Sequence, residues 1–123
     1  MEDKNRIVEE FIKHSLIMEQ TQYSGEYKKG NKSHEVHLSI RDKLKQDPEL
    51  AKGVFDELFH NENSFVLYAS SVYAIVLNYR KDDAIKILSK IAAMDIKLTS
   101  FEAETALELY KTGELFELHG VNK

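Results

Sequence analysis

The chain contains no cysteine, a single proline and only five glycines. Without cysteine there can be no disulfide and no thiolate chemistry, and we expect a protein of the reducing cytoplasm. So few prolines and glycines argue against a turn-rich β-sandwich and against a disordered linker. No stretch approaches the roughly 18 apolar residues that a membrane span requires, and no signal-type apolar run follows the first residues. These absences favour a compact cytoplasmic protein without a membrane segment.

Motifs of the common catalytic sites are missing as well. There is no G-x-S-x-G sequence, no glycine-rich phosphate loop and no recognisable acid pair. Ser70 and Ser71 lie inside an apolar segment, where a helical hydroxyl usually bonds to a carbonyl one turn earlier. We therefore expect no catalysis and no cofactor.

Size and charge narrow the function further. The 123 residues suit one domain, 1–123. Seventeen basic and twenty-one acidic residues give a net charge of −4. This mild acidic excess argues against a nucleic-acid binder driven by a strong positive field, although a local basic patch is compatible with it.

Apolar residues recur at helical spacing along most of the chain, which predicts an all-α fold of about six helices. Two N-terminal helices are expected within residues 3–46. Ser24-Gly25 should end the first helix, and Ser24 is a candidate N-cap of the second. Gly30 and Asn31 are poor helix formers, so the second helix begins either beside Ser24 or near Asn31.

The second helix has a predicted apolar stripe of Val36, Ile40 and Leu44, and it ends near Gln46. Asp47 and Pro48 then predict a new helix, since aspartate can cap it and proline fits its first position.

A core of similar helices is expected over residues 47–113. The segment from Phe65 to about Asn78 is apolar nearly all round, which is typical of a helix buried at the centre of a bundle. Asp82 is expected to cap the following amphipathic helix. Thr99 and Glu102 form a predicted capping box for the last one.

That last helix should pack through the apolar residues Phe101, Ala103, Ala106, Leu107, Leu109 and Tyr110. Gly113 is placed where a helix-ending glycine is expected, and the tail 114–123 should add at most one frayed turn.

The two kinds of helix alternate with a period of 33 to 34 residues. Val54-Phe55 and Leu58 match Ile87-Leu88 and Ile91, and a second match relates two alanine-rich helices. Stacked helical hairpins give this pattern, since each repeat covers the apolar face of its neighbour. An ordinary antiparallel bundle can give one such match by chance.

The run from Glu49 to Ala93 resembles HEAT repeats, and the residues that carry the resemblance are Phe55, Leu58, Phe59, Asn63, Val66, Ala69, Val72, Ala84, Leu88 and Ile91. The whole chain is similar to a small bacterial HEAT-like domain family of unknown function, through Gly25-Glu26, Asn31-Lys32 and the alanine-rich helix from Ala103 to Gly113. The resemblance implies a short HEAT-like α-α superhelix or curved bundle with two to three helical hairpins. Ser70-Ser71 departs from the pattern, in which another alanine is common. These are packing motifs, so they imply no activity.

Several histidines stand at spacings close to those of metal ligands. His34 and His37 are three residues apart, whereas the zincin motif needs four, so they form at most a weak metal site and otherwise a solvated helix face. Glu57 and His60 have the spacing of a di-iron ligand pair, but no second copy of that pair occurs. Glu10 and His14 are expected to form a surface pair. We expect no metal.

Polar helix faces are therefore the expected working surface, with Tyr68 and Tyr79 as candidate interface anchors. The candidate partner-binding residues are Lys52, Asp56, Glu57, Tyr68, Tyr79, Asp83, Lys86 and Lys90. The expected function is to bind a protein partner, and its sharpest form is an immunity-type inhibitor of a bacterial toxin. An acidic inhibitor would be steered towards a basic nuclease.

Two alternatives remain open from the sequence. One is a nucleic-acid-binding HEAT-like protein that uses lysines such as Lys28, Lys29 and Lys32. The other is a homo-oligomeric structural or regulatory module, because the sequence does not fix the oligomeric state.

Overall fold

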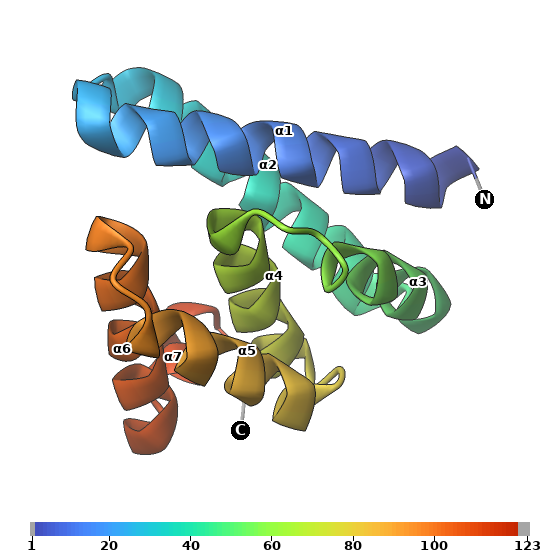
Figure 1. Cartoon of the computed structure of the whole chain (residues 1–123). Coiled ribbons are helices and arrows are strands. Elements are labelled where there is room, and N and C mark those ends of the chain that lie inside the picture. Colours follow the sequence, from blue (N-terminus) through green and yellow to red (C-terminus); the bar gives the residue numbers. More distant parts are fainter. Residues whose placement is uncertain (1, 121–123) are drawn as a thin grey trace. The chain divides into compact units, whose positions relative to one another are not determined.

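A computed structural model describes residues 2–120, and these residues are 86% helical with no strand among them. The all-α prediction is confirmed. The helices are α1 (Glu2–Ser24), α2 (Tyr27–Gln46), α3 (Pro48–Leu58), α4 (Ser64–Leu77), α5 (Lys81–Ala93), α6 (Lys97–Thr112) and α7 (Glu114–Leu118) (Figure 1). The described part has one helix more than expected, because α7 forms where a frayed turn was predicted. No helix within residues 2–120 combines the length and the apolar content that crossing a membrane requires.

The helices group into two compact units, which divide between Asn61 and Glu62. The first unit holds α1 to α3 and the second holds α4 to α7. The predicted core 47–113 thus contributes α3 to the first unit and α4, α5 and α6 to the second.

In the first unit, α1 and α2 form a hairpin, and α3 packs against both. Its buried apolar side chains include Phe11, Leu44 and Phe55. Gly25 makes the turn with a φ of 79°, a left-handed conformation that glycine adopts without steric cost. The prediction that Ser24 caps α2 is wrong, because Ser24 still belongs to α1. Its hydroxyl accepts a bond from the Glu26 N–H across the turn.

Helix α2 begins at Tyr27 and continues through Gly30 and Asn31, so the alternative start near Asn31 is also wrong. The reason lies across the hairpin. A Cβ atom at position 30 would stand 2.6 Å from Thr21 Oγ1, closer than two such atoms can approach. Glycine here lets the helices touch, and this contact offsets its poor helix propensity.

The buried stripe of α2 is Ser33, His37, Ile40 and Leu44. Ile40 and Leu44 were predicted, but Val36 is only half-buried and His37 takes the inner position in its place. The buried face is therefore rotated by one residue and carries two polar side chains.

Helix α3 begins as the sequence predicts. Asp47 Oδ1 accepts a bond from the Leu50 N–H at 3.2 Å, and Pro48 occupies the first position. All the groups that make this start lie within four residues, so the sequence alone suffices to find it.

Helix α4 is the buried helix of the second unit, as predicted, and packs against α5 and α6. Asn63 caps it by accepting a bond from the Val66 N–H at 2.9 Å. The Ser70 hydroxyl donates to the Val66 carbonyl one turn earlier, as expected of a serine in a buried helix.

The predicted starts of α5 and α6 are wrong. Arg80, with a left-handed φ of 46°, precedes α5, and Asp82 lies inside its first turn without capping it. Helix α6 begins at Lys97, two residues before the predicted cap Thr99, whose side chain is fully buried. The Ser100 hydroxyl satisfies this end by accepting a bond from the Ile96 N–H at 2.9 Å.

Gly113 ends α6 with a φ of 85°, as the sequence predicts. It also allows the chain to reverse into α7, which packs against α6 and buries Leu115.

Candidate functional site

The polar residues predicted on α3 lie on its outer side. Lys52 and Glu57 are exposed and Asp56 is half-buried. Glu57 Oε1 pairs with Lys4 Nζ of α1 at 2.9 Å. Such a partly exposed pair contributes little to stability. Part of this polar face therefore already ties two helices of the first unit together.

Three further predicted residues, Asp83, Lys86 and Lys90, lie on α5 in the second unit. Their spacing of three and four residues puts them on one side, away from the buried Ala84, Leu88 and Ile91. Asp83 Oδ2 lies 3.0 Å from Arg80 Nε, whereas Lys86 and Lys90 are exposed. The face is polar and mixed in charge, as the sequence predicts.

The two predicted tyrosines, Tyr68 and Tyr79, are half-buried. Tyr68 packs edge-on against Phe65 with ring centroids 5.5 Å apart. Burial raises the pKa of the Tyr68 hydroxyl, and the negative charge of Glu102, to which this hydroxyl is hydrogen-bonded, raises it further. Tyr68 of α4 and Glu102 of α6 therefore interact within the second unit, and both line the same hollow.

The two histidines considered as metal ligands point apart. His34 is exposed, whereas His37 is completely buried and stacks on Phe11, with ring centroids 4.1 Å apart. The prediction of a solvated face is wrong for His37. Within residues 2–120, no three histidine, cysteine, aspartate or glutamate side chains gather so as to hold a metal ion.

A hydrogen-bonded arrangement surrounds His37 Nε2, which lies 3.1 Å from both the Phe11 carbonyl and Ser15 Oγ. Ser15 donates to the same carbonyl at 2.7 Å, so Nε2 must carry the proton and donate. Burial lowers the pKa of His37 to about 4, which keeps the ring neutral at neutral pH.

Glu10, His14 and Ser33 line up in the order of an acid–histidine–serine relay. His14 Nε2 lies 3.3 Å from Glu10 Oε2, and His14 Nδ1 lies 2.9 Å from Ser33 Oγ. The sequence predicts the first pair but not the second, because that contact joins α1 to α2. Ser33 is only 2% exposed, so its hydroxyl cannot meet a substrate. The arrangement fastens the hairpin and supplies no nucleophile.

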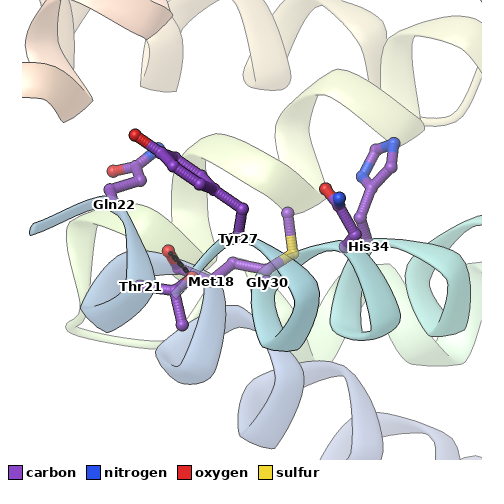
Figure 2. Close-up of a pocket in the computed structure, with 7 residues that line it drawn as sticks. Met18, Thr21, Gln22, Tyr27, Gly30 and His34 are labelled. Atoms are coloured by element: carbon purple, nitrogen blue, oxygen red, sulfur yellow. Dashed lines mark hydrogen bonds between the residues drawn. The ribbon is translucent and has the colours of Figure 1, made fainter. Parts of the chain in front are cut away.

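An open hollow of about 230 Å³ lies where α1 ends and α2 begins. Figure 2 shows Met18 and Gln22 of α1 facing Tyr27 and His34 of α2, with the tyrosine at one end and the histidine at the other. The exposed lysines Lys28, Lys29 and Lys32 occupy other positions on α2 and do not line it. The hollow therefore has an aromatic and amide character without a strong charge.

A second hollow, an apolar groove of about 290 Å³, lies in the second unit between α4, α6 and α7. Val72, Ala106, Leu109 and Leu115 supply apolar walls, and Glu102 and His119 add polar groups. Hollows that combine apolar walls with a few convergent polar groups are the usual sites of binding. We call this hollow the α6–α7 groove.

Two large apolar side chains stand exposed among the residues that line the α6–α7 groove. Phe101 is 64% exposed and Leu118 is 69% exposed. Phe101 was predicted to pack inside, but α6 buries Thr99, Ala103 and Ala106, which turns position 101 outward. The sequence did not reveal this site, since α7 is too short to show a helical period.

Comparison of the chain with protein-family models, with curated proteins and with solved structures gives no match.

Proposed function

We propose that this chain is a non-enzymatic module that binds a protein partner through the α6–α7 groove. The observation that carries the proposal is the exposure of Phe101 and Leu118 beside apolar walls. Aromatic side chains that leave water on association supply much of the affinity in protein interfaces. A single exposed leucine is ordinary, but two large apolar side chains at one groove favour a partner.

The fold that we propose for this role is a short HEAT-like α-α superhelix. Its support is the alternation of a buried helix, α4, with the amphipathic α5, and the packing of α6 on both. Stacked hairpins of this kind offer rigid surfaces to partners.

The sharpest form of the proposal is a cytoplasmic, immunity-type inhibitor of a bacterial toxin. Its support is the small size and the net charge of −4, since an acidic inhibitor is steered towards a basic nuclease. In this form the polar face of α5, with Lys86 and Lys90, would border the contact rather than anchor it.

Photo-crosslinking in the native cell tests the proposed function. A photoreactive phenylalanine analogue replaces Phe101 in one variant and Lys86 of α5 in a second, and the crosslinked products are identified by mass spectrometry. We expect a discrete protein adduct from position 101 that is weaker or absent from position 86. Both sites are exposed, so neither substitution should disturb folding.

Three results would speak against the proposed function. An adduct only at position 86 would move the contact to the polar face. An adduct made of a second copy of this chain would indicate the homo-oligomeric alternative, which light scattering would then check. Loss of all adducts at both positions would contradict protein binding altogether.

A further inference from the structure

We propose that the α6–α7 groove takes an amphipathic helix whose polar side is basic. This inference rests on the proposed function and names the chemistry of the partner. It follows from the direction of the apolar stripe, from the charges around it, and from the kind of backbone that the second unit presents.

The apolar stripe follows the axis of α6. Leu98 and Phe101 are exposed, and Leu109 lines the groove two turns further on. From Leu98 to Leu109 the helix rises by about 16 Å, which corresponds to about three turns of a partner helix. Glu102 and Thr105 lie between them on the same side of α6, so the apolar line contains two polar side chains.

The charges around the stripe are mostly acidic. Helices α6 and α7 contain five glutamates and two lysines. Of these lysines, Lys111 lies 3.5 Å from Glu108 and is already paired. Exposed carboxylates on Glu104, Glu114 and Glu117 add to the field. A partner with lysine or arginine beside its apolar face would find complementary charge here.

Glu102 brings one carboxylate to the groove itself. It lines the groove together with Phe101 and Tyr68. An ionised carboxylate has about four acceptor positions. It can therefore accept from Tyr68 and still accept from a basic side chain of the partner.

The same charges argue against a second copy of this chain in the groove. Two such grooves facing each other would bring glutamates of α6 and α7 against glutamates, and like charges in contact oppose association. A partner strand is disfavoured for a different reason. Within residues 62–120 there is no sheet edge to extend, so main-chain pairing is not available. An amphipathic helix needs only a matching apolar stripe.

Three synthetic peptides of about 18 residues test this inference, a length that gives about five helical turns. The first carries a leucine stripe at helical spacing with lysine on its other positions. The second keeps the stripe but has glutamate in place of lysine. The third has the composition of the first in a scrambled order without a stripe. Binding to the full chain is measured by fluorescence anisotropy and mapped by NMR chemical-shift changes.

We expect only the first peptide to bind and its shift changes to gather at Phe101, Leu109 and Leu118. Phe101→Ser should weaken it at least about tenfold, as for an aromatic anchor. Glu102→Gln keeps the shape of the side chain and should weaken it by about three- to tenfold through loss of charge. Glu35→Gln is the matched control, because exposed Glu35 belongs to α2 of the first unit and does not line the groove, and it should change binding less than twofold.

Equal binding of the lysine and glutamate peptides would overturn the charge assignment. Equal binding of the scrambled peptide, or shift changes that ignore Phe101, would overturn the docking site. If no peptide binds while position 101 still crosslinks to a cellular protein, this inference fails and the proposed function stands. If position 101 yields no adduct and the lysine peptide binds in the groove, the inferred chemistry of the groove stands and the proposed function in the cell fails.

Discussion

His37 shows how one residue can make the fold sensitive to acid. Its ring is sealed between α1 and α2, where it stacks on Phe11 and donates to the Phe11 carbonyl. Protonation would place a charge in this seam, and burial disfavours that charge. The other titratable groups nearby are His14, His34 and Glu10. The two histidines oppose the protonation of His37 further.

The stability of the protein should therefore fall as the pH is lowered from 6.5 to 4. The folded pKa of His37, about 4, lies below its ordinary value of 6.5, so the unfolded chain binds the proton more readily. The contribution is complete above pH 6.5, declines as the pH falls, and levels off below about 4. The difference corresponds to about 3 kcal/mol. Urea unfolding at a series of pH values measures it.

His37→Gln should flatten this part of the pH profile, because glutamine does not titrate. His60→Gln is the control, since His60 is exposed and is not among the groups that shift the pKa of His37. If the His37 variant keeps the full slope between pH 6.5 and 4, another group causes the acid sensitivity.

Thr99 provides a test in which the sequence and the structure predict opposite signs. As an N-cap it would stabilise α6, and Thr99→Val would cost about 1 kcal/mol. In the structure its side chain is fully buried, and no group within residues 2–120 bonds to its hydroxyl. Valine has the same shape without the unsatisfied hydroxyl. We therefore expect Thr99→Val to stabilise the protein by about 1 kcal/mol.

Thermal and urea unfolding decide between the two signs. Ser100→Ala is the companion variant, because its hydroxyl accepts from the Ile96 N–H, and its loss should cost about 1 kcal/mol. Destabilisation by Thr99→Val together with a neutral Ser100→Ala would restore Thr99 as the cap.

At the scale of single elements, the sequence predicts what is decided locally. The start of α3 at Asp47 and Pro48 and the end of α6 at Gly113 depend on neighbours in the chain, and both predictions are confirmed. The starts of α5 and α6 are different. A cap contributes about 1 kcal/mol, and burying a side chain in the tertiary fold can outweigh it. Thr99 is such a case.

The α6–α7 groove is hidden from the sequence for a related reason. A helical period shows that one side of α6 is buried. It does not distinguish that side from a side rotated by a single residue. Burial of Ala103 and Ala106 turns Phe101 outward, whereas the sequence suggests that Phe101 packs. The exposed, charged side of α5 could be predicted from the sequence, because Lys86 and Lys90 lie opposite a clear apolar stripe.

The close approach of α1 and α2 at Gly30 predicts the effect of replacing this glycine. Replacing a helical glycine with alanine usually stabilises a helix by about 1 kcal/mol. At position 30 the new Cβ would stand 2.6 Å from Thr21 Oγ1, whose hydroxyl donates to the Met18 carbonyl. We expect Gly30→Ala to destabilise the protein by about 1 to 3 kcal/mol, as overpacking does. Unfolding by urea measures the change.

Gly53 of α3 is the matched control for this substitution. A Cβ at position 53 would meet Cδ and Cγ of Lys4, which belong to a flexible and partly exposed side chain. Gly53→Ala should therefore be neutral or stabilising by up to about 1 kcal/mol. Adding Thr21→Ala to Gly30→Ala should recover part of the loss. Equal effects of both glycine substitutions would show that helix contact does not decide the outcome.

For the whole molecule, the distribution of charge decides between a protein partner and a nucleic acid. On α2, basic and acidic residues are interspersed. Around the exposed Lys28, Lys29 and Lys32, exposed Glu26 and Glu35 lie on the same stretch of chain. The acidic α6 and α7 would repel phosphates from the α6–α7 groove. A positive field strong enough to hold a phosphate backbone is therefore not expected.

Binding to short double-stranded DNA and to single-stranded RNA at about 50 mM salt checks this expectation, because non-specific affinity is strongest at low salt. We expect a dissociation constant weaker than about 10⁻⁴ M, the upper end for non-specific binders. The triple variant Lys28→Gln, Lys29→Gln and Lys32→Gln should behave like the unchanged chain. Tight binding that falls steeply with salt and disappears in the triple variant would contradict the proposal. It would instead assign nucleic-acid binding to α2, through its exposed lysines.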